Sequence, residues 1–374
     1  MAQTHPTATV GKHPCPECGG DLQWSAARQA LACPYCGTLV PHGLGEALPD
    51  TGIVEQDLQQ ALSHPSSGRG WGNASALEKR EVQCQSCHAI SVFVDGKVAK
   101  RCDFCGSPSI MEHPSLNDAI TPQSLLPFKV SDAQMRTSLR QWYRSRWFAP
   151  SKLKSAALTD TLSGVYLPYW TFDAQASARW QAEAGHYYYE SESYQDAKGH
   201  RQVRQVRRVR WEPAAGSLAH FFDDELVPGT AGVHPALLRK IEPFPTQTDL
   251  QPYTPAFVRG WTVERYQIDL SKAEKLNQEA MQQQMQALCG QAVPGDTYRN
   301  LRVDANYQGR TFKHILVPVW LVSYTYGARN FQVIGNGYTG AMAGEQPYSW
   351  VKISVAVLGA LLLVFLLLSL NQAA

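Results

Sequence analysis

The 374-residue sequence lacks the motifs by which several common enzyme classes are recognised. It contains no G-x-x-x-x-G-K-[ST] loop, which excludes a helicase or another P-loop ATPase. The zinc-hydrolase motif H-E-x-x-H and the esterase motif G-x-S-x-G are absent as well. The segment 335–340 matches G-x-G-x-x-G, but it neither opens a helix nor precedes a suitably placed acidic residue, which favours a glycine-rich hairpin turn. We therefore assign no catalytic residue and no small-molecule substrate, and expect a protein that is not an enzyme.

Strong charge and an N-terminal apolar core are also missing. The formal net charge is +2, which by itself argues neither for nor against an anionic partner. The first eighteen residues, MAQTHPTATVGKHPCPEC, contain no apolar run of the kind found in a secretory signal peptide. We therefore expect the soluble part of the chain to stay in the cytoplasm.

Eight of the nine cysteines form four C-x-x-C pairs, arranged as two copies of one pattern. The first copy comprises Cys15, Cys18, Cys33 and Cys36, and the second comprises Cys84, Cys87, Cys102 and Cys105. In both copies fourteen residues separate the two pairs. A C-x-x-C turn supplies two thiolates, and two such turns complete a tetrahedral metal site, so the pattern predicts two zinc ribbons. Redox dithiols are the alternative, but they occur singly and on strand-to-helix turns.

Four thiolates leave no open position for water, so both zinc ions are expected to be structural. The same ligands also suit iron, and the spacing does not distinguish the two metals. Gly19, Gly37 and Gly106 follow three of the pairs, where a positive φ is often required, and His88 takes the equivalent position after the third pair. The ninth cysteine, Cys289, is expected to be a buried free thiol.

The C-terminal segment of the chain is apolar. The segment 353–370 holds eighteen residues without a charge, about 27 Å of helix against a hydrocarbon thickness of ~30 Å. Tyr348 and Trp350 precede it, as interfacial aromatics do, and Lys352 marks the cytoplasmic side. A buried core helix is the alternative. We expect a transmembrane helix, in a single-pass inner-membrane protein whose N-terminal part lies in the reducing cytoplasm.

The intervening sequence predicts an α+β domain with two related halves. Helices are expected at 131–148, with Ser131 as N-cap, and at 271–288. The strands predicted at 165–172 and 315–322 share an apolar-Pro-x-Trp signature offset by 150 residues, which indicates an internal duplication. Their prolines, Pro168 and Pro318, are expected at strand starts, edges or bulges. The domains are then a zinc ribbon at 1–40, a linker at 41–80, a second ribbon at 81–112, the α+β domain at 113–349 and the transmembrane helix at 350–370.

One strand of this domain is rich in arginine. Its basic residues are Arg201, Arg204, Arg207, Arg208 and Arg210. On a strand, three of them (Arg204, Arg208 and Arg210) share one face. They form either a surface for an anionic ligand, phospholipid headgroups or nucleic acid, or a hairpin that forms ion pairs across to Glu183, Glu190 and Glu192. We favour the hairpin. The nearby run 223–225, Asp-Asp-Glu, could bind a cation, but such runs are more often solvated turns or helix starts.

The chain resembles a bacterial family of membrane-anchored proteins with a transcription-factor-IIB-type zinc ribbon, often labelled primosomal helicase-like. The resemblance rests on 84–87 and 99–107, on Leu167-Pro-Tyr-Trp170, on 221–228 (FFDDELVP), on Val317-Pro-Val-Trp320 and on 335–340 with 347–349. The missing P-loop argues against the helicase label. Relatives occur with phage-shock and SPFH-type proteins, which implies an adaptor in a membrane or envelope-stress assembly.

Two classes of function follow. In the first, the protein is a non-catalytic, membrane-anchored adaptor whose ribbons present a cytoplasmic surface to a protein partner. In the alternative, the ribbons and the arginine-rich strand bind nucleic acid at the membrane. The ribbons carry few basic residues, which is a thin footprint for a phosphate-binding surface.

Overall fold

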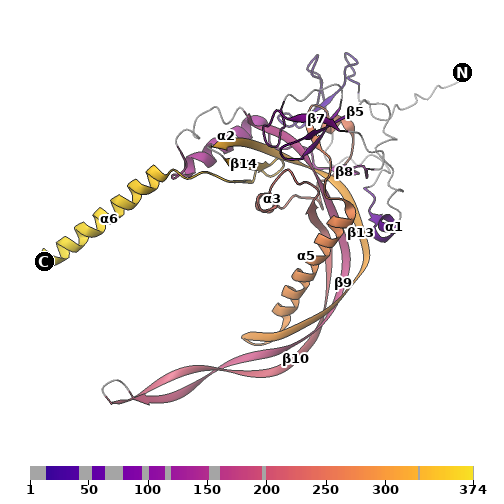
Figure 1. Ribbon diagram of the computed structural model, residues 1–374. Helices are drawn as coiled ribbons and strands as arrows, with labels where there is room; N and C mark the ends of the chain where they lie inside the picture. Colours follow the sequence, from indigo (N-terminus) through magenta and orange to yellow (C-terminus); the bar gives the residue numbers. More distant parts are fainter. Residues whose placement is uncertain are drawn as a thin grey trace.

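The computed structural model describes residues 14–41, 53–63, 79–94, 101–113, 119–150, 161–195, 199–326 and 329–373. A small N-terminal sheet contains the strands β1 (Gln23–Ser25), β2 (Ala30–Ala32) and β3 (Leu39–Val40). A twelve-stranded sheet forms the rest of the β structure (Figure 1). Its strands are β4 (Gln56–Asp57), β5 (Lys79–Cys84), β6 (Ile90–Val94), β7 (Ile110–His113), β8 (Ser124–Leu125), β9 (Ser163–Gln195), β10 (Arg201–Pro228), β11 (Gln251–Pro252), β12 (Thr262–Glu264), β13 (Thr297–Tyr326), β14 (Arg329–Asn336) and β15 (Met342–Gly344).

Six helices accompany these sheets in the described part of the chain. They are α1 (Leu58–Ser63), α2 (Asp132–Ser145), α3 (Pro235–Ile241), α4 (Pro255–Val258), α5 (Leu270–Ala292) and α6 (Trp350–Ala373). The two helices predicted within the domain are confirmed as α2 and α5. Ser131 caps α2 as predicted, in a capping box with Gln134. The short helix α1 lies in the segment predicted as a linker, and most of that segment lies outside the described residues.

The long strands β9, β10 and β13 form a curved sheet, and α5 lies on its concave side (Figure 1). Alternate residues of β9 between Ala174 and Ala184 are alanines apart from Trp180, and they are buried against α5. Small side chains on the strand let the helix approach closely. Met281, Met285 and Cys289 of α5 fill this contact, and Cys289 is a fully buried free thiol, as predicted.

The two Pro-x-Trp strands pair directly with each other. β9 and β13 are antiparallel, with Leu167 opposite Val317, so the two prolines lie symmetrically about this pair. The carbonyl of Pro168 accepts a hydrogen bond from the Gly229 N–H, and the carbonyl of Pro318 accepts one from the Gly337 N–H, both at 2.8 Å. The two signature prolines therefore have equivalent surroundings.

The signature tryptophans are equivalent too. The Trp170 indole donates to the carbonyl of Ile268 at 2.9 Å, and the Trp320 indole donates to that of Val130 at 3.0 Å. Each acceptor directly precedes the N-cap residue of a long helix, α5 in the first case and α2 in the second. In the predicted duplication, each tryptophan thus contacts the start of the helix assigned to the other half.

The prediction that the prolines lie at strand starts, edges or bulges is wrong. Pro168 lies inside β9, where the parallel neighbour β12 pairs with 165–166 and the antiparallel neighbour β10 begins pairing at Tyr169. Pro318 lies inside β13 between the pairing of β8 at 315–316 and that of β14 from Val319. A missing N–H is tolerated there because it falls at the junction between two neighbouring strands.

The predicted transmembrane helix and single-pass membrane location are also wrong. Among the described residues, none of the helices has the length and apolar character needed to cross a membrane. The structure shows a mixed α/β arrangement with large sheets, in which α6 is an exposed helix (Figure 1).

Candidate metal centres and a projecting arm

Both groups of four cysteines are assembled as the spacing predicts. In each group, the four sulfur atoms all lie within 4.8 Å of one another. The nearest sulfur pairs are 3.5 Å (Cys15–Cys36) and 3.4 Å (Cys18–Cys33) apart in the first group. The corresponding pairs in the second group are Cys84–Cys105 at 3.5 Å and Cys87–Cys102 at 3.6 Å. Tetrahedral zinc–sulfur bonds of ~2.3 Å require sulfur separations of ~3.8 Å, so both groups fit a metal ion such as zinc.

The turns that present the cysteines have the backbone conformation expected of them. Gly19, Gly37 and Gly106 have φ between 71° and 77°. His88 adopts the same conformation with φ 61°, although a side chain there is strained. In all four turns the N–H of this residue donates to the carbonyl of the first cysteine, at 2.8 to 3.0 Å.

At least one thiol in each group has a lowered pKa, which favours the thiolate that a metal requires. The Thr38 hydroxyl, 3.1 Å from the Cys36 sulfur, lowers the pKa of that thiol to about 6. In the second group, the hydrogen bond from Cys87 lowers the pKa of Cys102 to about 5. Metal binding then displaces fewer protons at these positions.

The first ribbon packs against the α/β domain through β1. Trp24 is buried, and its indole donates to the carbonyl of Phe128 at 2.8 Å while its ring contacts Phe257. Arg259, itself buried, forms an ion pair with Asp21 at 3.2 Å. Within the cysteine turns, Cys15 and Cys33 are buried in the same cluster as Trp24, whereas Cys18 and Cys36 are exposed.

The second ribbon is part of the large sheet. Its strand β6 pairs with β12, and the Asp103 carboxylate accepts a hydrogen bond from the Thr262 hydroxyl at 2.6 Å. The next residue, Phe104, is fully buried, and its carbonyl accepts hydrogen bonds from Ser323 and from Gln332. A cysteine turn of this ribbon is therefore inserted into the core of the domain.

These contacts change how the ribbons are interpreted. Trp24 and Phe104 bury ribbon surfaces inside the molecule, so those surfaces are not free to bind a partner. The sequence pattern alone could not have shown this, because the contacts join residues more than one hundred positions apart.

A projecting arm is the main exposed feature of the domain (Figure 1). β13 stops pairing with β9 at Gly185, and beyond this point β9 and β10 continue as a two-stranded hairpin. We call residues 186–195 and 201–210 the arm. Its exposed aromatic side chains are Tyr187, Tyr188, Tyr189 and Tyr194, and Val203 is 68% exposed. A two-stranded hairpin has only marginal stability in water on its own.

The five arginines all lie on this arm. The register places Arg204, Arg208 and Arg210 on one face and Arg201 and Arg207 on the other, as predicted. Cross-strand ion pairs join Arg204 to Glu192 at 2.8 Å and Arg208 to Glu190 at 3.4 Å.

Glu183 and Arg207 do not form the ion pairs expected within the described part of the hairpin. Glu183, expected to pair within the hairpin, forms an ion pair with Arg299 of β13 instead. Arg207 lies 4.4 Å from the centre of the Tyr187 ring. The hairpin interpretation is therefore confirmed for two of the three glutamates, and the arm's surface combines charged and aromatic groups.

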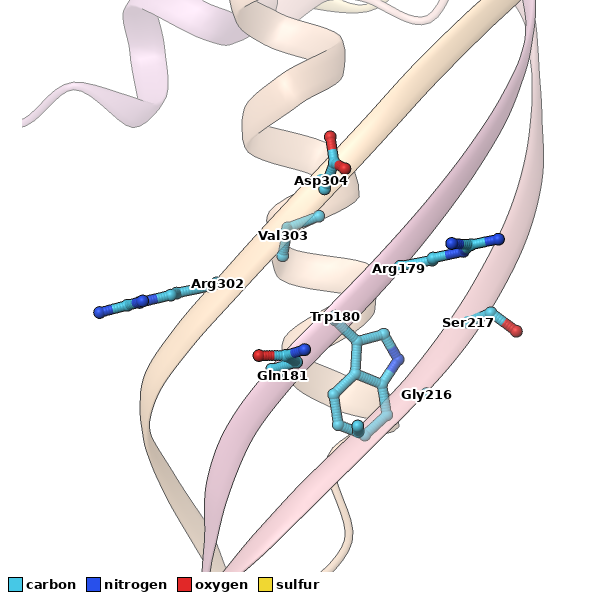
Figure 2. Close-up of a pocket in the computed structure, with 9 residues that line it drawn as sticks. Arg179, Trp180, Gln181, Gly216, Ser217, Arg302, Val303 and Asp304 are labelled. Carbon is cyan, nitrogen blue, oxygen red and sulfur yellow. The ribbon is translucent and has the colours of Figure 1, made fainter.

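An open depression of about 500 Å³ lies on the curved sheet nearer to its centre (Figure 2). Figure 2 shows Arg179 and Arg302 pointing in opposite directions, with Asp304 directed away from both. The polar groups do not converge on a common point, so we assign no small ligand to this depression.

Comparison with known proteins gives little direct guidance. No family model matches the chain, and no solved structure matches it. The chain is similar to the uncharacterized protein YdjG of Bacillus subtilis (strain 168), with 23% identity over 344 residues that cover 91% of each chain. The similarity extends over nearly the whole length of both chains.

Proposed function

We propose that the chain is a non-catalytic adaptor that is stabilised by two structural zinc ions and binds another protein through the arm. The observation that carries this proposal is the extension of β9 and β10 beyond Gly185 with four exposed tyrosines. Tyrosine and arginine are enriched in protein interfaces and supply much of the binding energy there.

The arrangement of charge supports a protein partner over a nucleic acid. The segment 186–210 contains six basic and three acidic residues, a net charge of only +3. Two of the five arginines are already paired with glutamates of the facing strand, which reduces the charge available to phosphates. The face that carries Tyr187, Tyr189 and Val203 has two charged side chains against five on the opposite face, and its apolar and aromatic groups suit a protein surface.

In this proposal the ribbons support the arm. The second ribbon adds strands to the sheet from which the arm projects, and the first covers another part of its core. Metal binding therefore stabilises the base of the arm, and the partner contacts its exposed end.

Nucleic acid binding remains the second candidate because aromatic and basic side chains alternate on the arm. Arg207 lies over Tyr187, and Arg204 lies 5.4 Å from the ring centre of Tyr194. Single-stranded nucleic acids bind to surfaces that combine stacking rings with basic groups.

Binding experiments on arm variants separate the two candidates. The arm variant replaces Tyr187, Tyr189 and Val203 with serine. A matched control replaces Arg302 of the neighbouring strand β13 with glutamine. We expect the tagged full-length chain to retain the same protein after nuclease treatment in wild-type and control forms, and to lose it in the arm variant. Retention of that protein by the arm variant would contradict the proposal. Binding of a labelled single-stranded oligonucleotide that is abolished by Arg201, Arg204 and Arg207 to glutamine would favour the second candidate.

A further inference from the structure

A β-bulge in β10 brings three carboxylates together away from the ribbons and the arm. The register between β9 and β10 shifts between Phe222 and Glu225, and Asp224 within this bulge has φ 55°. One carboxylate oxygen from each of Asp173, Asp223 and Asp224 lies within 4.8 Å of the other two. Bulges of this kind redirect side chains, and they are often found next to functional sites.

Two of the three carboxylates are enclosed. Asp173 is 3% and Asp224 is 7% exposed. The backbone N–H of Asp224 donates to Asp173 Oδ1 at 2.6 Å, and the Thr311 hydroxyl lies 3.1 Å from Asp173 Oδ2. The positively charged side chain beside these carboxylates is Lys313, whose Nζ lies 2.8 Å from Asp224 Oδ1 and 3.2 Å from Glu55 Oε1.

The charges in this cluster do not balance. One ammonium group faces the carboxylates of Glu55, Asp173 and Asp224, and Asp223 adds a fourth at the exposed side. Buried carboxylates without compensating charge are costly. At neutral pH the group therefore carries excess negative charge.

A second observation, independent of the carboxylates, indicates a missing ligand. The Thr171 hydroxyl is fully buried and has no hydrogen-bond partner. Thr171 lies two residues before Asp173, on the same face of β9, and its cross-strand neighbour on β13 is Lys313. Buried hydroxyls are normally satisfied, so a further polar species is expected beside it.

We propose that Asp173, Asp223 and Asp224 bind a divalent cation of the hard, oxygen-preferring class, such as Ca²⁺, Mg²⁺ or Mn²⁺. Two ligands on opposite sides of a calcium ion lie ~4.8 Å apart, so the observed separations fit direct coordination by all three carboxylates. The cation offsets the excess negative charge, and the unpartnered Thr171 hydroxyl lies on the face of β9 that carries Asp173. Such an ion ties the bulge of β10 to the centre of β9.

Manganese binding to the full-length, metal-loaded chain tests this site, because Mn²⁺ prefers oxygen ligands and does not compete well for four thiolates. Electron paramagnetic resonance at pH 7.5 measures the free ion during titration. We expect about one bound Mn²⁺ per chain, displaced by Ca²⁺ or Mg²⁺, and an affinity at least tenfold weaker in Asp224→Asn and Asp223→Asn. The control Asp304→Asn, at an exposed position of β13, should bind as the wild type does.

A variant at the exposed member of the cluster serves as the control for misfolding. Asp223 is exposed, so Asp223→Asn should keep the wild-type circular dichroism spectrum and still lose affinity. Thermal unfolding gives a second readout, since the ion should raise the melting temperature of the wild type and not that of Asp223→Asn. The proposal is overturned if the folded wild type binds no Mn²⁺ at millimolar concentration, or if both aspartate variants bind it undiminished.

Discussion

The two metal centres should release their ions at very different rates, because equivalent turns of the two ribbons lie in different surroundings. The third residue of the last cysteine turn is Tyr35 in the first ribbon, where it is 80% exposed. The same position in the second ribbon is Phe104, which is fully buried. Opening the second site therefore requires the removal of Phe104 from the core, while opening the first does not.

The difference can be estimated from the burial of this side chain. Removing a buried phenylalanine from its contacts costs about 3–5 kcal/mol, which corresponds to a rate lower by a factor of roughly 100 to 5,000. The ordered hydrogen bonds from Ser323 and Gln332 to the Phe104 carbonyl add to this cost.

A chelator that absorbs on binding the metal follows the release directly. We expect two phases of equal amplitude, the fast one without a change in near-ultraviolet circular dichroism and the slow one together with loss of tertiary structure. Cys18→Ser should remove the fast phase, and Phe104→Ala should accelerate the slow one. Release of both ions at one rate, or release first from the second ribbon, would refute the reasoning.

Three further substitutions test individual parts of the structure. His88→Gly should stabilise the metal-loaded protein by about 0.5–1 kcal/mol in denaturant unfolding, since glycine relieves the strain of φ 61°; a loss of stability would argue against that strain. Gly216→Ala should lower the melting temperature, because the added Cβ would lie 2.5 Å from the Trp180 ring, whereas Ala215→Ser beside it should have little effect. Burial lowers the pKa of His314 to about 4, so the unfolded chain binds a proton first, and stability should fall by up to about 3 kcal/mol between pH 6.5 and 4. His314→Gln should flatten this pH dependence, and an unchanged profile would count against the assignment.

The local parts of the structure could be predicted from the sequence. The cysteine spacing and the glycines after the pairs predicted both cysteine clusters, because the residues of a C-x-x-C turn determine the backbone conformation of that turn. The N-cap of α2 and the ion pairs of Arg204 and Arg208 followed for the same reason, since they depend on neighbouring residues or on one hairpin. The hairpin turn after β14 is a further local feature, with Asn336 hydrogen-bonded to Ala341 as predicted for the glycine-rich segment.

Contacts between distant segments could not be predicted. Nothing in the sequence around Phe104 indicates that its carbonyl meets Ser323 and Gln332. The prolines were misplaced because a strand with two successive neighbours on one edge leaves a gap that a single-sequence pattern does not reveal. The apolar composition of 353–370 predicted a membrane span that the structure does not support.

Site-specific photocrosslinking on the arm tests the adaptor proposal most directly. A photoreactive amino acid replaces Tyr189, which is 67% exposed, and in a matched variant it replaces Arg302, which lies on the same sheet outside the arm. After irradiation in the native cells, the account predicts one dominant protein crosslink from position 189 that is insensitive to nuclease and absent from position 302. Equal crosslinking from both positions, or crosslinks from position 189 to nucleic acid alone, would contradict it.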